Sequence, residues 1–336
     1  MNKNTDQIIP LSVVIISKNE EENIASSIES AISATKEFND SEIILADSAS
    51  TDRTIEIAKK YPIRIVQLKP FWRLSPSAGC YSGFLQSKGE FIQFIGGDMI
   101  LDNHWFTYAI PILEKEEIGG VSGICTQENY GTIVSKRVAK YHNNLPFGEI
   151  PYLVGATFFK RNALLESGPF NPWLRANEEG ELSYRVRDKG YKLMRLPYHI
   201  THHLGGKNDS LKFFFKKQVL SAVAQGQIIR YSLYNRRILS WRLKNYNYKI
   251  KITGFFLILF GTLAIISANF GFFIVIYLWI LAIIVEFLLI FLKIRKVKYA
   301  IKLLITQTLK SPFFFLGFIA PKRNPDAYPA DVEVIQ

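Results

Sequence analysis

Cysteine is nearly absent from this chain, which has only Cys80 and Cys125 among its 336 residues. Two separated cysteines do not provide the disulfide framework that stabilises many small secreted domains. We therefore expect a protein of a reducing compartment, in which both thiols are buried and take no part in chemistry.

The N-terminus lacks the features of a signal peptide. Residues 1–10 are polar, and the apolar run Leu11–Ile16 that follows is too short to serve as a signal-peptide core. We therefore expect the N-terminal part of the chain to stay in the cytoplasm.

Charge is missing from residues 252–292, where Glu286 is the only charged residue in 41 positions. A membrane crossing needs ~20 residues, because a helix rises ~1.5 Å per residue and the hydrocarbon core is ~30 Å thick. The run is long enough for two crossings, and the Asn and Gly within residues 267–271 favour a turn between them. The sequence therefore predicts a transmembrane helical hairpin.

Acidic residues are scarce on both sides of this apolar run, and the net charge of the whole chain is +12. Residues 207–251 contain eleven Lys or Arg and one acid, and residues 293–298 contain four more Lys or Arg. By the positive-inside rule both flanks lie in the cytoplasm, where they attract anionic phospholipids with ~1 kcal/mol per charge. Basic clusters also occur in nucleic-acid-binding proteins, but their position beside an apolar run favours a membrane partner and no nucleic acid.

These patterns divide the chain into four predicted segments. Residues 1–206 are expected to form a soluble α/β domain, and residues 207–251 basic amphipathic helices at the membrane surface. Residues 252–292 supply the two transmembrane helices, and residues 293–336 a basic interfacial segment and a cytoplasmic tail. A third crossing over residues 299–319 is the alternative, and it would place the tail outside.

Short apolar runs alternate with helical patterns in the N-terminal segment. This alternation is typical of a doubly wound sheet that is mostly parallel, in which ligands bind beyond the carboxyl ends of the strands. The predicted strands are 11–16, 42–46, 63–68 and 91–95, and the predicted helices are 19–35, 51–60 and 78–87.

Polar and acidic residues follow three of these strands directly. Ser17, Asn19 and Glu20 come after the first strand, a loop from Asp47 to Asp52 after the second, and Asp98 after the fourth. Acidic loops on one sheet edge repel anions unless a cation is present, whereas with a divalent ion they make a diphosphate site.

Four segments in this order make the chain resemble glycosyltransferase family 2, an inverting group with a GT-A fold. The resemblance covers roughly residues 10–205 and implies a nucleotide-sugar donor. The matching segments are Ser12–Ile24, Ile44–Thr54, Lys88–Ile92 and Asn177–Arg185.

The resemblance gives Asp47 the position of an acid that contacts the nucleobase. A carboxylate at a strand end can accept a hydrogen bond from a ring N–H, although Ser48 replaces the second acid of the family string. The structural alternative is a turn-forming Asp, and for Asp52 we favour that structural role at a helix start.

Asp98 matches the second acid of the family's metal-binding Asp-x-Asp motif. The resemblance therefore implies a divalent ion, Mg²⁺ or Mn²⁺, bridging diphosphate oxygens. The first acid is replaced by Gly96, which removes one usual sugar or ribose contact. His202 or His203 stands where many GT-A enzymes have a histidine near the metal, and Arg73 where a basic residue often contacts the diphosphate.

Glu178 and Glu179 stand where the family has Glu-Asp at a helix start. An inverting transfer needs one carboxylate to take the proton from the acceptor hydroxyl as that oxygen attacks the anomeric carbon. We therefore predict Glu179 as the general base and Glu178 as the residue that orients its loop. The structural alternative is an acid-rich helix N-terminus.

These features predict a glycosyltransferase of the cytoplasmic membrane that spans the membrane more than once. It would move a sugar from a nucleotide-diphosphate sugar to a hydroxyl of a lipid-linked glycan. Within the fold, the alternative is a polyprenyl-phosphate glycosyltransferase, whose acceptor would not need a strong base. The alternatives of another kind are a non-catalytic nucleotide-sugar-binding scaffold and, from the string Gln227–Tyr231, a processive synthase.

Overall fold

A computed structural model describes residues 11–38, 40–127, 145–204, 211–244, 246–268, 274–329 and 331–336. Within them the chain forms two compact units, residues 1–214 with 323–336, and residues 215–322. We call these the head unit and the helical unit.

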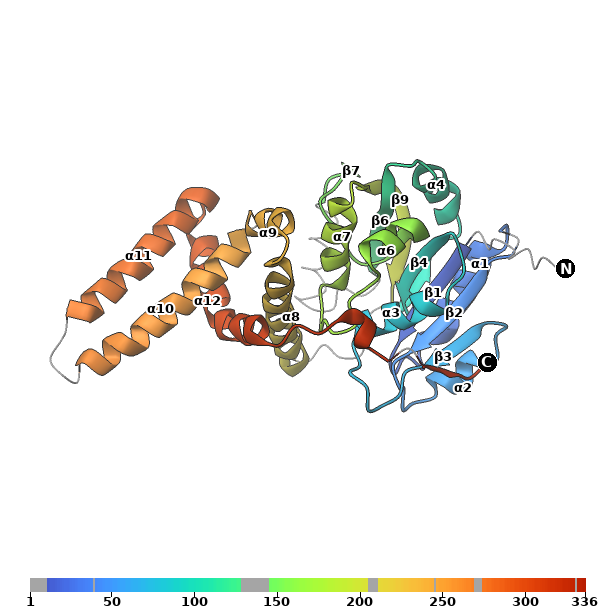
Figure 1. The fold of residues 1–336 in the computed structure, drawn as a ribbon, viewed down its shortest axis with the longest axis horizontal. Helices are drawn as coiled ribbons and strands as arrows, with labels where there is room; N and C mark the ends of the chain where they lie inside the picture. Colours follow the sequence, from blue (N-terminus) through green and yellow to red (C-terminus); the bar gives the residue numbers. More distant parts are fainter. Residues whose placement is uncertain are drawn as a thin grey trace. The chain divides into compact units, whose positions relative to one another are not determined.

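The head unit contains one mixed sheet flanked by helices on both faces (Figure 1). Its path through the described strands is β10-β3-β2-β1-β4-β8-β6-β9-β5, and β7 pairs with β9 off this path. The strands are β1 Leu11–Ser17, β2 Glu42–Asp47, β3 Arg64–Gln67, β4 Phe91–Gly96, β5 Met99–Leu101, β6 Ile118–Gln127, β7 Gly148–Glu149, β8 Thr157–Lys160, β9 Lys192–His203 and β10 Glu333–Val334. The helices are α1 Ile24–Thr35, α2 Thr54–Ala58, α3 Pro76–Gln86, α4 Trp105–Leu113, α6 Arg161–Ser167, α7 Glu178–Asp188 and the 3₁₀ turn η1 Pro325–Ala327.

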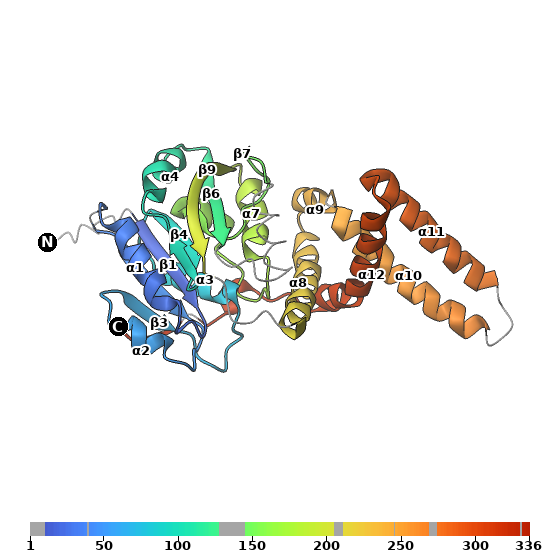
Figure 2. The ribbon, with the colours of Figure 1, turned by 180° about the vertical axis from the view of Figure 1, so that it is seen from behind.

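Two hydrophobic clusters hold the sheet between its helices. Successive residues of β1 point to opposite faces, so Val13 and Ile15 pack with α1 and α4, whereas Val14 packs with α3, α6 and α7. Figure 2 shows α1 on the side opposite to the α3 and α6 side seen in Figure 1. All three side chains are fully buried, which contributes ~1.5–3 kcal/mol each.

The sequence predicted the parallel part of the sheet well, since β3, β2, β1 and β4 pair in parallel as expected. Two helices begin later than predicted, α1 at Ile24 instead of Asn19 and α2 at Thr54 instead of Thr51. Asn19 has a positive φ of 57°, and its amide group bonds the loop after β2 instead of capping α1. Beyond β4 the sheet becomes mixed, because β8 inserts antiparallel between β4 and β6.

The helical unit contains two helices that are long and apolar enough to cross a membrane, with spans at 250–267 and 274–292. They pack against each other where Gly261 leaves room for the Trp279 ring, and the Trp279 indole N–H donates to the Leu257 carbonyl at 2.8 Å. The predicted turn, 267–271, lies mostly outside the described residues. The helices running through this unit are α8 Leu211–Ser232, α9 Arg236–Leu243, α10 Tyr246–Ala268, α11 Ile274–Ile294 and α12 Val297–Ile319.

Helix α12 covers the predicted interfacial stretch as one helix, with Pro312 inside it. After α12 the chain returns to the head unit, where β10 pairs antiparallel with β3. The predicted segment 293–336 is therefore divided between the two units, because its last residues complete the edge of the sheet.

Candidate active site

The carboxylate of Asp47 lies fully buried at the carboxyl end of β2. Its Oδ2 accepts hydrogen bonds from the hydroxyls of Ser17 at 2.9 Å and Ser50 at 2.5 Å. Its Oδ1 accepts from the Ser50 backbone N–H and from the Gln67 amide, both at 2.8 Å. A carboxylate has about four acceptor positions, so all of them are engaged within the protein. A nucleobase could bond Asp47 only by displacing one of these partners.

The loops after β1 and β2 are joined by side-chain hydrogen bonds. The Asn19 N–H donates to Ser50 Oγ at 2.8 Å, and Asn19 Oδ1 accepts from the Thr51 N–H at 2.9 Å. Asp52 accepts from the backbone N–H groups of Glu21 at 3.1 Å and Thr54 at 3.0 Å. The structural role predicted for Asp52 is confirmed by these bonds.

Glu20 is half-buried at the start of this region. Burial, together with the negative charges of Asp98 and Asp52, raises the pKa of Glu20 to about 7. A Cβ added at Gly97 would lie 3.3 Å from Glu20 Cγ, which places Glu20 beside the predicted metal motif.

Asp98 and His203 come together at one end of the antiparallel β5–β9 pair. The distance from Asp98 Oδ2 to His203 Nε2 is 3.1 Å. His202 is the next residue on β9, so its side chain points to the opposite face, where its Nδ1 lies 2.8 Å from Thr126 Oγ1. Of the two predicted histidines, the structure therefore brings His203 to Asp98 and takes His202 away.

The described residues contain no group of three or more His, Cys, Asp or Glu side chains arranged to hold a metal ion. A carboxylate and an imidazole nevertheless suit an ion that completes its coordination with diphosphate oxygens and water, as Mg²⁺ and Mn²⁺ do. Gly96 suits this arrangement, because a Cβ there would lie 2.6 Å from Asp98 Oδ1. The donor set fits a divalent ion held jointly by protein and substrate.

Glu178 and Glu179 are the first two residues of α7, and they follow a residue whose backbone conformation is unusual for a non-glycine residue. The preceding Asn177 has a φ of 61°, in the left-handed region, and it turns the chain sharply into the helix. Burial raises the pKa of both glutamates, and repulsion from Glu178 adds to the larger rise at Glu179. A carboxylate in this state binds a proton strongly, as a general base requires.

The two cysteines lie close enough to Glu179 for its negative charge to affect the pKa of their thiols. Burial raises the pKa of the thiols of Cys80 on α3 and Cys125 on β6, and the negative charge of Glu179 adds to both shifts. Both thiols are free, and Cys80 is buried as expected whereas Cys125 is half-buried; their inertness stays a prediction. Their positions place Glu179 near α3 and the end of β6.

Arg73 lies in the loop between β3 and α3, whose backbone is fixed from the far end of the chain. The hydroxyl of Tyr328 donates to the Arg73 carbonyl at 2.9 Å. The side chain of Arg73 is half-buried. Its predicted contact with a diphosphate stays a prediction.

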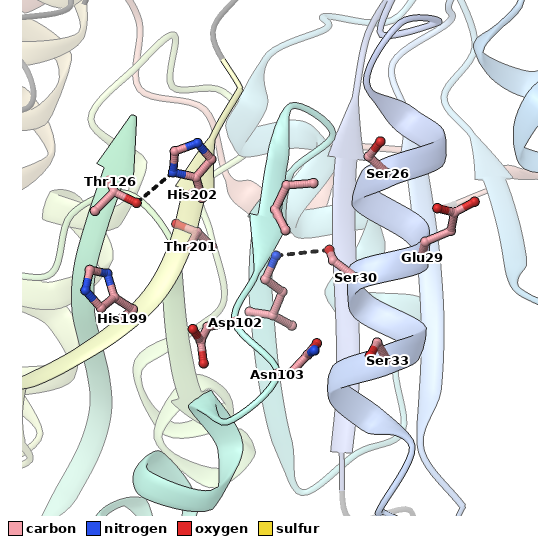
Figure 3. Close-up of a pocket in the computed structure, with 12 residues that line it drawn as sticks. Ser26, Glu29, Ser30, Ser33, Asp102, Asn103, Thr126, His199, Thr201 and His202 are labelled. Carbon is pink, nitrogen blue, oxygen red and sulfur yellow. Dashed lines mark hydrogen bonds between the residues drawn. The ribbon is translucent and has the colours of Figure 1, made fainter. Parts of the chain in front are cut away.

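A cavity of about 520 Å³ opens elsewhere in the head unit (Figure 3). Ser26, Ser30 and Ser33 line it from one side of α1, and His202 lines it from β9. Its lining includes His202 among the predicted site residues, but none of Asp47, Asp98, Glu178 and Glu179.

Sequence reasoning missed Ser50 and Gln67, which hold Asp47 in place, and Tyr328, which holds the Arg73 loop. Gln67 follows from register, because it pairs with Asp47 across β2 and β3. Tyr328 had no local signal, because its partners lie about 150 to 260 residues earlier in the chain.

Comparison with known proteins places this sheet and its loops in a known group. Residues 12–171 match glycosyl transferase family 2. EpsE of Bacillus subtilis is 28% identical over 207 residues, covering 54% of this chain and 72% of that protein. A dolichyl N-acetyl-alpha-D-glucosaminyl phosphate 3-beta-D-2,3-diacetamido-2,3-dideoxy-beta-D-glucuronosyltransferase of Methanococcus voltae is 23% identical, covering 92% of this chain and 97% of that protein.

A solved structure extends this similarity to the fold. The mannosyltransferase PcManGT from Pyrobaculum calidifontis, in complex with GDP-Man and Mn²⁺, superposes with a TM-score of 0.56 at 16% identity. The match covers 91% of this chain and 88% of that one, and it identifies the fold as GT-A. Residues 12–171 of this chain therefore match glycosyl transferase family 2, and this match together with the named relatives supports a glycosyltransferase.

Proposed function

We propose that this enzyme transfers a sugar, with inversion, from a nucleotide-diphosphate sugar to a hydroxyl of a lipid-linked glycan at the cytoplasmic membrane face. The observation that carries the proposal is the pairing of Asp98 with His203 in a head whose α7 begins with a buried glutamate, Glu178, and a half-buried one, Glu179. A diphosphate site and a base are the two groups that an inverting transfer requires.

Glu179 is the proposed base, because its environment favours a bound proton. As the acceptor oxygen bonds to the anomeric carbon, the bond from that carbon to the diphosphate breaks, and the hydroxyl proton moves to a Glu179 carboxylate oxygen. Repulsion from the neighbouring Glu178 carboxylate, when that group is ionised, raises the pKa of Glu179 further and so strengthens its basicity. No covalent intermediate with the protein is needed.

Asp98 and His203 are the residues that would hold a divalent ion. When bound, such an ion supplies positive charge beside the departing diphosphate. The likeness to a structure that contains GDP-Man and Mn²⁺ supports a nucleotide donor and a divalent metal for this chain.

The acceptor is proposed from the apolar helices and from one relative. That relative's name describes a dolichyl phosphate-linked sugar as the acceptor, and its match covers 92% of this chain. The spans at 250–267 and 274–292 would keep the head at the membrane, where such lipids are found.

Nucleotide release by the detergent-solubilised protein tests the proposal. We would assay a panel of nucleotide sugars with Mn²⁺ and a membrane lipid extract, and compare wild type with Asp98→Ala and Glu166→Gln. Glu166 is an exposed acid that bonds Tyr191, so its variant controls for loss of a carboxylate outside the site.

We expect release from one donor that depends on lipid extract, is lost in Asp98→Ala and is kept in Glu166→Gln. Donor binding without turnover under all conditions would contradict the proposal and favour a non-catalytic binding protein.

A further inference from the structure

The last residues of the head unit place one tyrosine in an aromatic cluster. Tyr328 is 2% exposed, and its ring lies 5.8 Å from Trp72, 6.0 Å from Tyr81 and 5.2 Å from Trp173 between ring centroids. Each pair meets edge to face, the geometry that aromatic rings prefer. A single side chain therefore contacts the β3–α3 loop, α3 and the segment before α7.

Hydrogen bonds fix the same contacts. The Tyr328 hydroxyl donates to the Arg73 carbonyl at 2.9 Å, and burial raises the pKa of Tyr328 to about 12, so this donor stays protonated. The Trp173 indole N–H donates to the Asn324 carbonyl at 2.8 Å, and the Arg323 guanidinium lies 4.6 Å from the Trp173 ring centroid. We call residues 323–328 the C-terminal clasp.

The two segments that the clasp joins carry proposed functional residues. The β3–α3 loop contains Arg73, and the chain from Trp173 leads within five residues to Glu178. These segments also contact each other, since Ser77 Oγ donates to the Asn171 carbonyl at 2.6 Å. The clasp contacts both segments, through Tyr328 on Trp72 and Arg73 and through Asn324 on Trp173.

We propose that Tyr328 is a positioning residue, and that the C-terminal clasp sets the Arg73 loop and the Glu179 helix start in the geometry that sugar transfer needs. This inference rests on the proposed function for the roles of Arg73 and Glu179. A misplacement of ~1 Å at reacting groups can lower a rate ~100-fold, so a clasp remote from the reacting atoms can control turnover.

The end of the chain beyond the clasp offers a matched control. β10 pairs with the edge strand β3, and Asp331 bonds Lys69 at 2.5 Å. Removing residues 332–336 deletes β10 and keeps the clasp, whereas Tyr328→Ala keeps β10 and empties the aromatic cluster. The two changes separate a positioning role from general stabilisation by the tail.

The experiment measures kcat, KM and backbone hydrogen exchange in the full chain. We expect Tyr328→Ala to lower kcat ~10- to 100-fold, with a smaller change in donor KM, and to speed exchange over residues 69–75 and 171–179. Tyr328→Phe keeps the ring and loses only the hydroxyl, so it should restore most of kcat. The 332–336 deletion should keep kcat and should not change exchange in those two segments.

Unchanged kcat and exchange in folded Tyr328→Ala, or an equal loss of kcat on deleting 332–336, would overturn the proposal. If Tyr328→Ala does not fold, Trp173→Phe replaces it, because that change removes the indole donor to Asn324 and keeps a smaller aromatic ring beside Tyr328. Faster exchange in 171–179 then supports the clasp, and unchanged exchange contradicts it. A wild type without turnover would refute the proposed function. Hydrogen exchange needs no substrate, so it would still test whether the C-terminal clasp positions residues 69–75 and 171–179.

Discussion

At the scale of single residues, the site contains carboxylates, whose removal from water costs free energy, and hydrogen-bond donors that hold one of them in place. Asp47 accepts four hydrogen bonds from three residues, whereas Glu178 and Glu179 are adjacent at the start of α7, where desolvation raises the pKa of both. The first arrangement fixes a loop, and the second raises proton affinity, as the proposed base at Glu179 requires. Residue type alone did not distinguish these two outcomes.

The pKa of Glu179 leads to a pH prediction for activity. The base must be ionised to take a proton, and burial and Glu178 raise its pKa. We therefore expect kcat of wild type to fall on the acid side at a pH well above ~4.3, the ordinary pKa of glutamate. A pH–rate profile from pH 5 to 9 measures this. An acid limb at the ordinary pKa of glutamate would contradict the assignment.

The same shift leads to a prediction for stability. A pKa raised in the folded state stabilises the fold below the unfolded pKa, and this contribution is lost as the pH rises through the folded pKa. Glu179→Gln removes the ionisation, so its melting temperature should exceed that of wild type by ~2–4 °C at pH 8. The gap should shrink at pH 5, as thermal unfolding at the two pH values would show. A variant less stable than wild type at pH 8 would contradict this account.

The separation of His203 from His202 leads to a prediction for metal binding. We expect His203→Ala to weaken Mn²⁺ binding ~10-fold or more, since groups at or next to a metal commonly contribute that much. His202→Ala is the matched control, because His202 bonds Thr126 on the other face of β9. Titration of Mn²⁺ into each purified protein would measure the affinities. Equal losses in both variants would show that the position of His203 beside Asp98 is unimportant.

At the scale of helices and strands, glycines that let segments approach closely are the clearest link between sequence and fold. A Cβ on Gly89 would lie 2.5 Å from the Ser12 backbone nitrogen, so the β4 entry packs directly on β1. We expect Gly89→Ala to lower the free energy of unfolding by ~1–3 kcal/mol, since a backbone atom cannot move aside cheaply.

The control for this prediction is Gly180, which lies within α7 and has no atom within 4 Å of an added Cβ. Gly180→Ala should raise stability by up to ~1 kcal/mol through helix propensity. Denaturant unfolding of both variants measures the two effects. A stable Gly89→Ala would mean that the two strands are not packed so closely.

How much of these elements the sequence predicts depends on the range of the interactions that form them. β-Branched runs predicted β1, β2 and β4 to within one or two residues, because local burial determines such strands. The start of α1 was misplaced, because Asn19 bonds the loop after β2 instead of the helix. The antiparallel β8 and the buried position of Tyr328 depend on distant partners, and no local pattern encodes them.

At the scale of the whole molecule, the route of the chain constrains how it could cross a membrane. The chain leaves the head unit at residue 214 and re-enters it at residue 323, where the C-terminal segment pairs with β3. Residues 214 and 323 belong to one folded unit, which lies on a single side of the membrane. The chain between them must therefore return to the side that it left, which requires an even number of crossings. Two crossings, by α10 and α11, satisfy this, and a third crossing by α12 does not.

This topology can be measured by labelling. In inside-out membrane vesicles, a cysteine at Gln336 and one at Asp188 should react with a membrane-impermeant maleimide to the same extent. A cysteine at Phe272, between the two spans, should react only in vesicles of the opposite orientation. Opposite labelling of positions 188 and 336 would contradict an even number of crossings.

The central claim is that Glu179 takes the acceptor proton in sugar transfer. The most direct test is the rate of labelled sugar transfer to a membrane lipid extract at pH 7.5 by wild type and by Glu179→Gln, with equal donor binding as the control. We expect a ~10²- to 10⁴-fold loss in the variant, the usual contribution of a general base. Transfer by Glu179→Gln within a few-fold of wild type would contradict it and would favour an acceptor that needs no base, such as a lipid phosphate.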